Sequence, residues 1–294
     1  MLVPMRAILA AADKYRYGQG AFNMNSVGQI EAAVRIHELL HSGAILQGAE
    51  ASNAFMGGEL DFMHGTLEAK KVGAKRIGDA VKQYGADSPV PIALHLDHGK
   101  SIESVKACID GGFTSVMIDG SHLPYEENVE LAKKVADYAH PRNVTVEAEL
   151  GRLAGIEDAV NVSAADASYT DPAQVQDFVE RTGVDSLAIA IGTSHGAYKF
   201  KPGQKPQLRF DILKEVSDRL PGFPIVLHGA SSVIPEYVEM INQFGGEMPD
   251  AIGIPEDMLR EAAKMAVCKI NVDSDLRLAM TAAVRKYLAE NPSH

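Results

Sequence analysis

The stretch PIALHLDHGKSIESVKACIDGG, Pro91–Gly112, joins a short apolar run to a segment whose apolar residues recur every three or four positions. The run at 91–97 is typical of a buried β-strand, and the segment after it is typical of an amphipathic helix. Asp97 and His98 stand where the run ends. The stretch therefore predicts a strand followed by a helix, with candidate functional groups at the junction.

The same unit recurs along the whole chain. Runs of this kind cover residues 20–26, 44–49, 91–97, 114–120, 144–151, 186–192, 224–229 and 268–273, and segments of helical period lie between them. Eight strand-helix units predict an α/β fold, a single (β/α)8 TIM barrel. A doubly wound open sheet is the alternative, but no GxGxxG follows the first run. Because no linker divides the chain, we expect one catalytic domain over residues 1–294.

Composition and charge exclude several classes of partner. With 46% hydrophobic and 23% charged residues, the chain can bury a large core. A net charge of -11 argues against binding to nucleic acid or to an anionic membrane, because both need clustered Lys and Arg. Neither a signal peptide nor a membrane span is predicted, so the expected location is cytoplasmic. Cys108 and Cys268 are expected to be buried, reduced thiols.

Polar residues gather at the carboxyl ends of the predicted strands. They are Asn23, Asn25, Ser26, Asp97, His98, Asp119, Ser121, Glu147, Glu149, His195, His228, Asn271 and Asp273. In a TIM barrel these ends meet at one face, and the active site lies there. The distribution therefore predicts a catalytic site rather than a purely structural barrel.

Three of these strand ends carry a histidine: His98, His195 and His228. Three imidazoles can hold Zn²⁺ and leave a coordination position for substrate. A single histidine of this kind is more often structural, but three at equivalent positions favour a metal site. Co and Fe suit the same ligands. His95 points along its strand and is expected to be structural or to support a ligand.

Two glycine-rich turns follow two of the histidines. GTSHGAYK, Gly192–Lys199, and HGASS, His228–Ser232, let backbone N–H groups approach an anion, and Lys199 adds a cation. Loops after the last strands of a TIM barrel often bind phosphate. The turns therefore indicate a phosphorylated substrate beside a metal.

Six motifs, LHLDHG, DGSHLPYEEN, VEAELGRLAGIED, IGTSHGAYKF, VLHGASS and KINVDSDLR, occur in this order. Together they closely resemble the class II, metal-dependent fructose-1,6-bisphosphate aldolases, from about Phe22 to Tyr287. The resemblance implies a lyase of glycolysis and gluconeogenesis that reversibly cleaves D-fructose 1,6-bisphosphate to dihydroxyacetone phosphate and D-glyceraldehyde 3-phosphate. It also implies a homodimer or homotetramer, with a monovalent cation as a candidate second cofactor.

The resemblance also assigns roles to individual residues. His98, His195 and His228 would hold Zn²⁺, which stabilises the enediolate as a Lewis acid, and Glu149 would belong to an alternative metal position. Asp97 would take the proton from the C4 hydroxyl during cleavage. Glu157 would move the proton at the carbon of the dihydroxyacetone phosphate half.

The remaining implied residues bind substrate. Asp273 favours fructose over tagatose bisphosphate, and Arg277 would reach the second phosphate across a subunit interface. The first phosphate and the neighbouring hydroxyls would contact Asn23, Gly196, Lys199, Gly229, Ser231, Asn271 and Ser274. Ala49 replaces a serine that many relatives use for phosphate, and the chain ends at AENPSH, where relatives usually continue with a further helical segment.

Three alternatives stay open at this point. The sugar could be tagatose 1,6-bisphosphate. A different metal-assisted barrel enzyme, such as a phosphosugar hydrolase or isomerase, would share the ligands without needing Glu157 and Arg277 together. A non-catalytic barrel could keep the site and serve as a binding protein, although the intact acid/base set favours catalysis.

Overall fold

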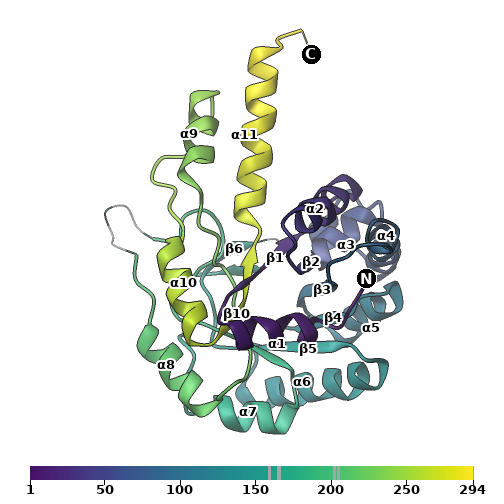
Figure 1. The fold of residues 1–294 in the computed structure, drawn as a ribbon, viewed down its shortest axis with the longest axis vertical. Coiled ribbons are helices and arrows are strands. Elements are labelled where there is room, and N and C mark those ends of the chain that lie inside the picture. The colour runs from purple at the N-terminus through teal and green to yellow at the C-terminus, as the bar shows by residue number, and fades with distance from the viewer. Residues whose placement is uncertain (158–159, 164–166, 201–202, 204–205, 294) are drawn as a thin grey trace.

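A computed structural model describes residues 1–157, 160–163, 167–200, 203 and 206–293 of the chain. Within these residues, parallel strands close into a barrel in the order β1-β10-β9-β8-β5-β4-β3-β2 (Figure 1). Their bounds are β1 Gln19–Asn23, β2 Ala44–Ala49, β3 Ile92–Gly99, β4 Ser115–Ile118, β5 Thr145–Leu150, β8 Ser186–Ile189, β9 Ile225–Leu227 and β10 Val267–Val272. The predicted TIM barrel is confirmed, and every predicted run overlaps one barrel strand.

Helices surround the barrel as an outer layer (Figure 1). Ser26, Thr66 and Ser101 cap α2, α4 and α5 by accepting a hydrogen bond from a first-turn N–H, which explains where these helices begin. The helical elements are α2 Val27–Leu39, α3 Glu50–Met56, η1 Phe62–His64, α4 Leu67–Gly85, α5 Ile102–Gly111, α6 Tyr125–Ala139, η2 His140–Arg142, α7 Val175–Thr182, α8 Phe210–Arg219 and α10 Glu256–Met265.

The barrel has an apolar layer on each face of its strands. Val116 and Ile118 of β4 pack outward against the helices, whereas Met117 between them packs with Ala188 and Val226 inside the barrel. This alternation follows from the two-residue period of a strand. Both cysteines are buried and free, as predicted from the sequence.

An N-terminal helix, α1 (Met5–Tyr15), closes one end of the barrel. Its buried Met5, Ile8 and Leu9 pack with Ile45 and Cys268, which are the second residues of β2 and β10 and so lie at the amino ends of these strands. Because α1 fills this end, the carboxyl ends of the strands remain for a functional site. The sequence analysis did not predict this helix.

Two helices, α9 (Pro235–Gln243) and α11 (Ser274–Glu290), extend side by side beyond the barrel (Figure 1). Val238 and Ile241 of α9 pack against Leu278 and Ala282 of α11. The sequence analysis also did not predict an antiparallel hairpin of β6 (Gly155–Glu157) and β7 (Val160–Val162), which follows β5.

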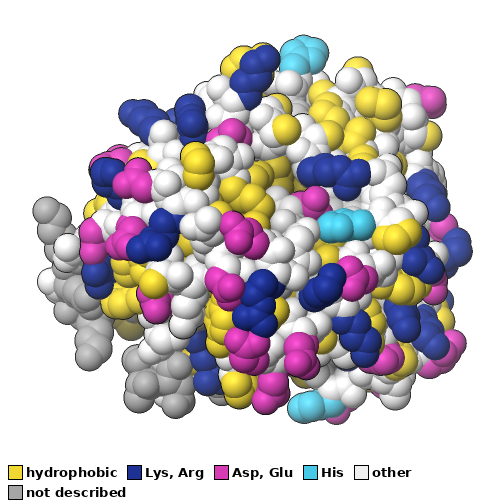
Figure 2. All heavy atoms as spheres, turned by 90° about the horizontal axis from the view of Figure 1, so that it is seen from below, with side chains coloured by type: hydrophobic (Ala, Val, Ile, Leu, Met, Phe, Trp, Pro, Cys, Tyr) yellow, Lys and Arg dark blue, Asp and Glu magenta, His cyan; other side chains and the backbone are white. Residues whose placement is uncertain are grey.

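The distribution of surface charge and the composition of the helices are relevant to binding of nucleic acid and membranes. On the face drawn in Figure 2, basic and acidic side chains are interspersed among the described residues, and neither sign covers a continuous area. Among the described helices, none combines the length and the apolar composition required to traverse a bilayer.

Candidate active site

Asp97 and His98 both reach the carboxyl mouth of the barrel because β3 is irregular at its end. The pairing of β3 with β4 shifts register between Leu96 and Gly99, and His98 has a φ of 48°, in the left-handed region. In a regular strand adjacent side chains would point to opposite faces, and a bulge re-aims them. A strained backbone at this point is typical of a functional site.

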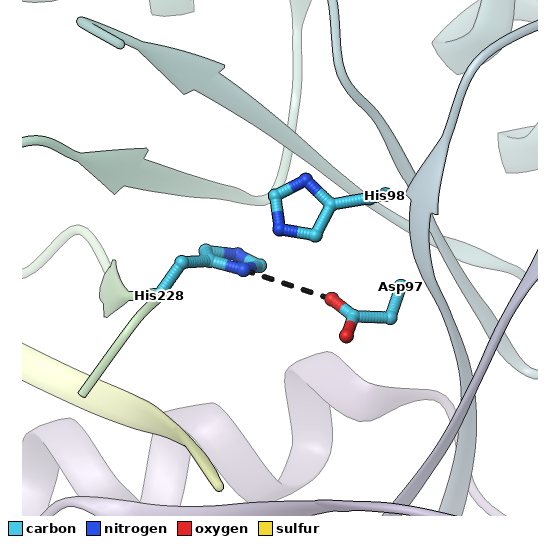
Figure 3. Close-up of side chains that lie close together, drawn as sticks. All are labelled: Asp97, His98 and His228. Carbon is cyan, nitrogen blue, oxygen red and sulfur yellow. Dashed lines mark ion pairs between the residues drawn. The ribbon is translucent and has the colours of Figure 1, made fainter. Parts of the chain in front are cut away.

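Three imidazole rings meet at this mouth. The ring centroid of His98 lies 5.2 Å from that of His195 and 4.5 Å from that of His228. Figure 3 shows His98 and His228 turned toward each other beside Asp97, whose Oδ1 is 3.6 Å from His228 Nδ1. The structure thus brings together the three histidines that the sequence singled out.

His98 lies in a strongly negative environment. Its Nδ1 is 2.9 Å from Asp119 Oδ2 and 3.9 Å from Glu149 Oε2. Burial lowers the pKa of His98, but the Asp119 hydrogen bond and the charges of Asp97, Asp119 and Glu149 outweigh burial and raise the pKa to about 10. These carboxylates therefore favour a positive charge here, which either a proton or a bound metal ion can supply.

Glu149 is almost completely buried beside His98. Burial, reinforced by the charge of Asp119, raises the pKa of Glu149 well above its usual value. Its Oε2 has no hydrogen-bond partner within the described part of the chain. A buried carboxyl oxygen without a partner needs an explanation, and a nearby cation would supply one.

Both ring nitrogens of His228 have hydrogen-bond partners. Its Nε2 is 2.7 Å from Glu147 Oε1, and its Nδ1 is 2.8 Å from the Asn271 amide nitrogen. Burial and the charges of His98 and Lys269 keep the pKa of His228 well below its usual value, so the ring is neutral. This network assigns the proton to Nε2, which donates to Glu147, so the Nδ1 lone pair accepts from the Asn271 amide. A metal ion bound at Nδ1 would take the place of that hydrogen bond.

The residues present fit a metal ion. His98 Nε2 is buried and has no hydrogen-bond partner among the residues that the structure describes. With His228 Nδ1 it offers nitrogen donors of the kind that a divalent transition metal prefers. Within the described residues, two groups bring their ligand atoms close enough to share one ion: Asp97, His98 and His228, and His98, Asp119 and Glu149. The ring of His195 lies beside His98 but belongs to neither group.

Asp97 is held by three side-chain amides. Asn23 and Gln47 donate to its Oδ2 at 3.0 and 3.1 Å, and Asn271 donates to its Oδ1 at 3.0 Å. Gln47 also donates to Asn23 Oδ1 at 2.7 Å. Gln47 was not predicted as a site residue, although a glutamine inside the apolar run AILQGA is a signal of an inward-facing polar group. The three donors fix the orientation of the carboxylate.

The two glycine-rich loops touch at Gly229. This residue has a φ of 57°, and a Cβ added to it would lie 2.5 Å from the carbonyl carbon of Ser194. Lys199 folds back over the same loop, with its Nζ donating to the Ser194 carbonyl at 2.6 Å. Ser231 Oγ accepts from the Asp273 N–H at 3.3 Å. These predicted phosphate-binding residues therefore form a contiguous surface.

Replacing Gly229 with alanine is expected to damage this contact. Left-handed strain of about 1–3 kcal/mol adds to the clash with the Ser194 backbone, so the free energy of unfolding should fall and KM for substrate should rise. Gly183→Ala is the matched control, since Gly183 has a φ of 69° and open space around its Cα. Steady-state kinetics measures KM, and thermal unfolding measures stability. Equal changes of KM in the two variants would contradict the role of the contact between the loops.

The other predicted residues are placed as follows. Arg277 Nε donates to Asp273 Oδ2 at 2.7 Å, and the Arg277 side chain is 50% exposed. Ser274 begins α11 at the mouth, and Gly196 has a φ of 84° in the loop after β8. The backbone of Glu157 lies in β6, but its side chain is outside the described part of the structure.

Three polar strand ends have other tasks. Ser26 caps α2, with its Oγ accepting from the Gln29 N–H at 3.2 Å. Ser121 Oγ donates to Asp119 Oδ1 at 2.7 Å. Glu147 lies inside the barrel below the mouth and is fully buried.

Comparison with known proteins agrees with this geometry. The family described as fructose-bisphosphate aldolase class-II matches residues 3–294. The chain belongs to the class II fructose-bisphosphate aldolase family. It is therefore an aldolase, a carbon-carbon lyase, and its family is metal-dependent. The grouped histidines are the candidate site for that metal.

Several relatives resemble this aldolase over nearly its whole length. A fructose-bisphosphate aldolase of Treponema pallidum is 49% identical over 98% of this chain and 86% of its own. One from Giardia intestinalis is 46% identical over 99% of this chain and 84% of its own. The crystal structure of the YdjI aldolase from Escherichia coli K12 matches with a TM-score of 0.73 and 29% identity, over 99% of this chain and 89% of that one.

Proposed function

We propose that this aldolase reversibly cleaves D-fructose 1,6-bisphosphate to dihydroxyacetone phosphate and D-glyceraldehyde 3-phosphate, with residues 1–294 acting as one catalytic domain. The observation that carries the proposal is the position of Asp97, which is held by three amides beside His98 and His228. A fixed carboxylate next to metal-type ligands combines a proton acceptor with the means to polarise a carbonyl.

Zn²⁺ is the proposed metal, with His98, His195 and His228 as its ligands and Glu149 at an alternative position. A bound divalent ion supplies Lewis-acid polarisation of the substrate carbonyl. The protein holds the donors in place, because Asp119 accepts a hydrogen bond from the far side of His98 and Glu147 does so for His228.

The proton transfers are proposed for two carboxylates, Asp97 and Glu157. In cleavage, Asp97 takes the proton of the C4 hydroxyl, the C3–C4 bond breaks, and its electron pair stays with the dihydroxyacetone phosphate half. Glu157 then supplies the proton at that carbon. In condensation the same two groups work in reverse, so Asp97 returns its proton to the aldehyde oxygen.

Substrate binding is proposed for the contiguous surface around the two loops and the start of α11. Backbone N–H groups there and the Lys199 ammonium suit a phosphate. The proposed residues are Asn23, Gly196, Lys199, Gly229, Ser231, Asn271, Asp273 and Ser274. Asp273 is proposed to favour the fructose configuration.

A homodimer is the proposed minimum assembly, and a homotetramer built from two such dimers is the larger form. The outer side of α11 exposes Met280, Val284 and Tyr287 by 51%, 56% and 51%. Their spacing of three and four residues places them on one side of the helix, and a continuous apolar patch marks an interaction site. A groove of about 480 Å³ between α3 and α11 is lined by Phe55 and Arg277, among others. A second copy on this surface would bury it and bring Arg277 to the neighbouring site.

Arg277→Ala is expected to raise KM for fructose 1,6-bisphosphate at least tenfold, because a phosphate loses a charged donor, while the oligomer persists. Arg260→Ala is the control, since Arg260 is exposed on α10 and pairs with Glu256. Steady-state kinetics and sedimentation measure the two effects. A wild-type protein that is fully active as a monomer would contradict a site shared between subunits.

Product analysis separates this function from its alternatives. Incubation with fructose and tagatose 1,6-bisphosphates should give two triose phosphates, with the fructose sugar consumed faster. Inorganic phosphate or an isomerised hexose would indicate a hydrolase or an isomerase, and no turnover of either sugar would favour a binding role.

A cytoplasmic location is proposed because both cysteines are free thiols.

A further inference from the structure

A charged layer lies inside the barrel directly beneath the site. His95, Glu147 and Lys269 stand two residues before Asp97, Glu149 and Asn271 on β3, β5 and β10. Alternate residues of a strand face the same side, so these three point inward below the mouth. All three are fully buried. Barrel interiors are normally filled by apolar layers, so a charged layer at this depth calls for a function.

Lys269 forms a buried ion pair with Glu147, the carboxylate that accepts a hydrogen bond from His228. Its Nζ is 3.1 Å from Glu147 Oε1 and 3.1 Å from Glu147 Oε2. Glu147 Oε1 also accepts the proton of His228 Nε2 at 2.7 Å. An ammonium group close to both oxygens limits rotation of the carboxylate. The position of the His228 ring therefore depends on Lys269 through one intermediate group.

The surroundings offer Glu147 little alternative. His95 Nε2 is 3.8 Å from Glu147 Oε2 and 3.4 Å from Lys269 Nζ, while His95 Nδ1 is 2.8 Å from Ser115 Oγ. Removing one partner of a buried ion pair leaves an uncompensated charge, which strongly disturbs its neighbours. Without Lys269, the negative charge of Glu147 would be uncompensated and the carboxylate would no longer be held in the position from which it accepts from His228.

We propose that Lys269 is a positioning residue of the metal site, which holds Glu147 so that His228 keeps its Nδ1 turned toward His98 and Asp97. The inference rests on the proposed function, because His228 is a proposed metal ligand. Lys269 itself touches neither substrate nor metal. Its effect therefore appears first in metal binding and only then in turnover.

The test measures the affinity of the purified full chain for Co²⁺ and Zn²⁺ by competition with a chelator, together with the visible spectrum of the Co²⁺ form. Lys269→Met is expected to weaken metal binding about 10- to 100-fold and to change the Co²⁺ spectrum. The double variant Glu147→Gln/Lys269→Met removes both charges of the buried Glu147–Lys269 pair, and its amide oxygen can still accept from His228. It is expected to recover most of the affinity.

Two further variants keep the test decisive. Cys268→Ala is the matched control, because it removes a buried side chain from the same strand that packs with Met5 and Ile8 instead of Glu147. Lys269→Gln keeps a donor toward Glu147, so it replaces Lys269→Met if the latter does not fold, and an intermediate affinity is expected.

The outcomes separate the two levels of the account. A wild-type chain that binds no divalent metal would overturn the metal site, and the role of Lys269 with it. The role of Lys269 alone would be overturned if the wild type binds metal, His228→Ala loses this binding, and Lys269→Met binds metal as tightly as the wild type. A double variant that binds metal as weakly as Lys269→Met would also overturn positioning through Glu147.

Discussion

Asp97→Ala is expected to lower kcat for fructose 1,6-bisphosphate cleavage by about 10²- to 10⁴-fold, the usual contribution of a general acid or base. The metal content should stay at the wild-type level, because His98, His195 and His228 remain. Turnover in the coupled assay and metal analysis of the same preparation measure the two quantities.

The amides around Asp97 provide the control. Gln47→Leu removes one of three donors to the carboxylate and leaves the carboxylate in place, so its loss of kcat should be much smaller than that of Asp97→Ala. Loss of metal together with activity in Asp97→Ala would show instead that Asp97 is structural. Its 3.6 Å approach to His228 Nδ1 would then be the important contact.

The second large effect is expected from His98→Ala. The substitution removes the ring whose buried Nε2 has no partner among the described residues, so the protein should bind Zn²⁺ far more weakly and lose cleavage with it. The loss should exceed the roughly 10- to 100-fold that outer partners of a metal site cost. Metal competition titration and turnover at saturating Zn²⁺ measure it.

His37→Ala is the matched substitution for that experiment. His37 is a buried histidine on α2 that stacks edge-on against Phe22 and contacts the carbonyl of Ala33. It should lose stability but keep metal affinity. Comparable metal loss in both variants would mean that His98 acts through folding rather than through ligation.

The fold was largely predictable from local patterns. The run at 44–49 coincides with β2, whereas the runs at 114–120 and 224–229 extend past β4 and β9 because their polar last residues belong to the loops. The helix α1 was missed because its apolar residues, interrupted by charges, resemble an ordinary N-terminal patch. The hairpin of β6 and β7 was missed because its strands are only three residues long.

A site residue was predictable only where it stands directly after an apolar run, at the carboxyl end of a predicted strand. His98, His195 and His228 each follow an apolar run, so their meeting follows from barrel closure. Gln47 and Lys269 lie inside runs, and Glu147, although counted among the strand ends in the sequence, lies one layer deeper; the contacts of all three cross the barrel. Glu147 and Lys269, for example, are 122 residues apart. Such contacts depend on which interior layer each side chain occupies, and a single sequence does not specify the layers.

Removing the metal with a chelator tests whether cleavage depends on a metal ion at the grouped histidines. Cleavage of fructose 1,6-bisphosphate by the purified chain is followed in a coupled assay before EDTA, after EDTA and after Zn²⁺ is restored, with tagatose 1,6-bisphosphate in parallel. EDTA is expected to abolish cleavage of the fructose sugar, and Zn²⁺ is expected to restore it. Cleavage that persists at the full rate after the metal has been removed would contradict this dependence.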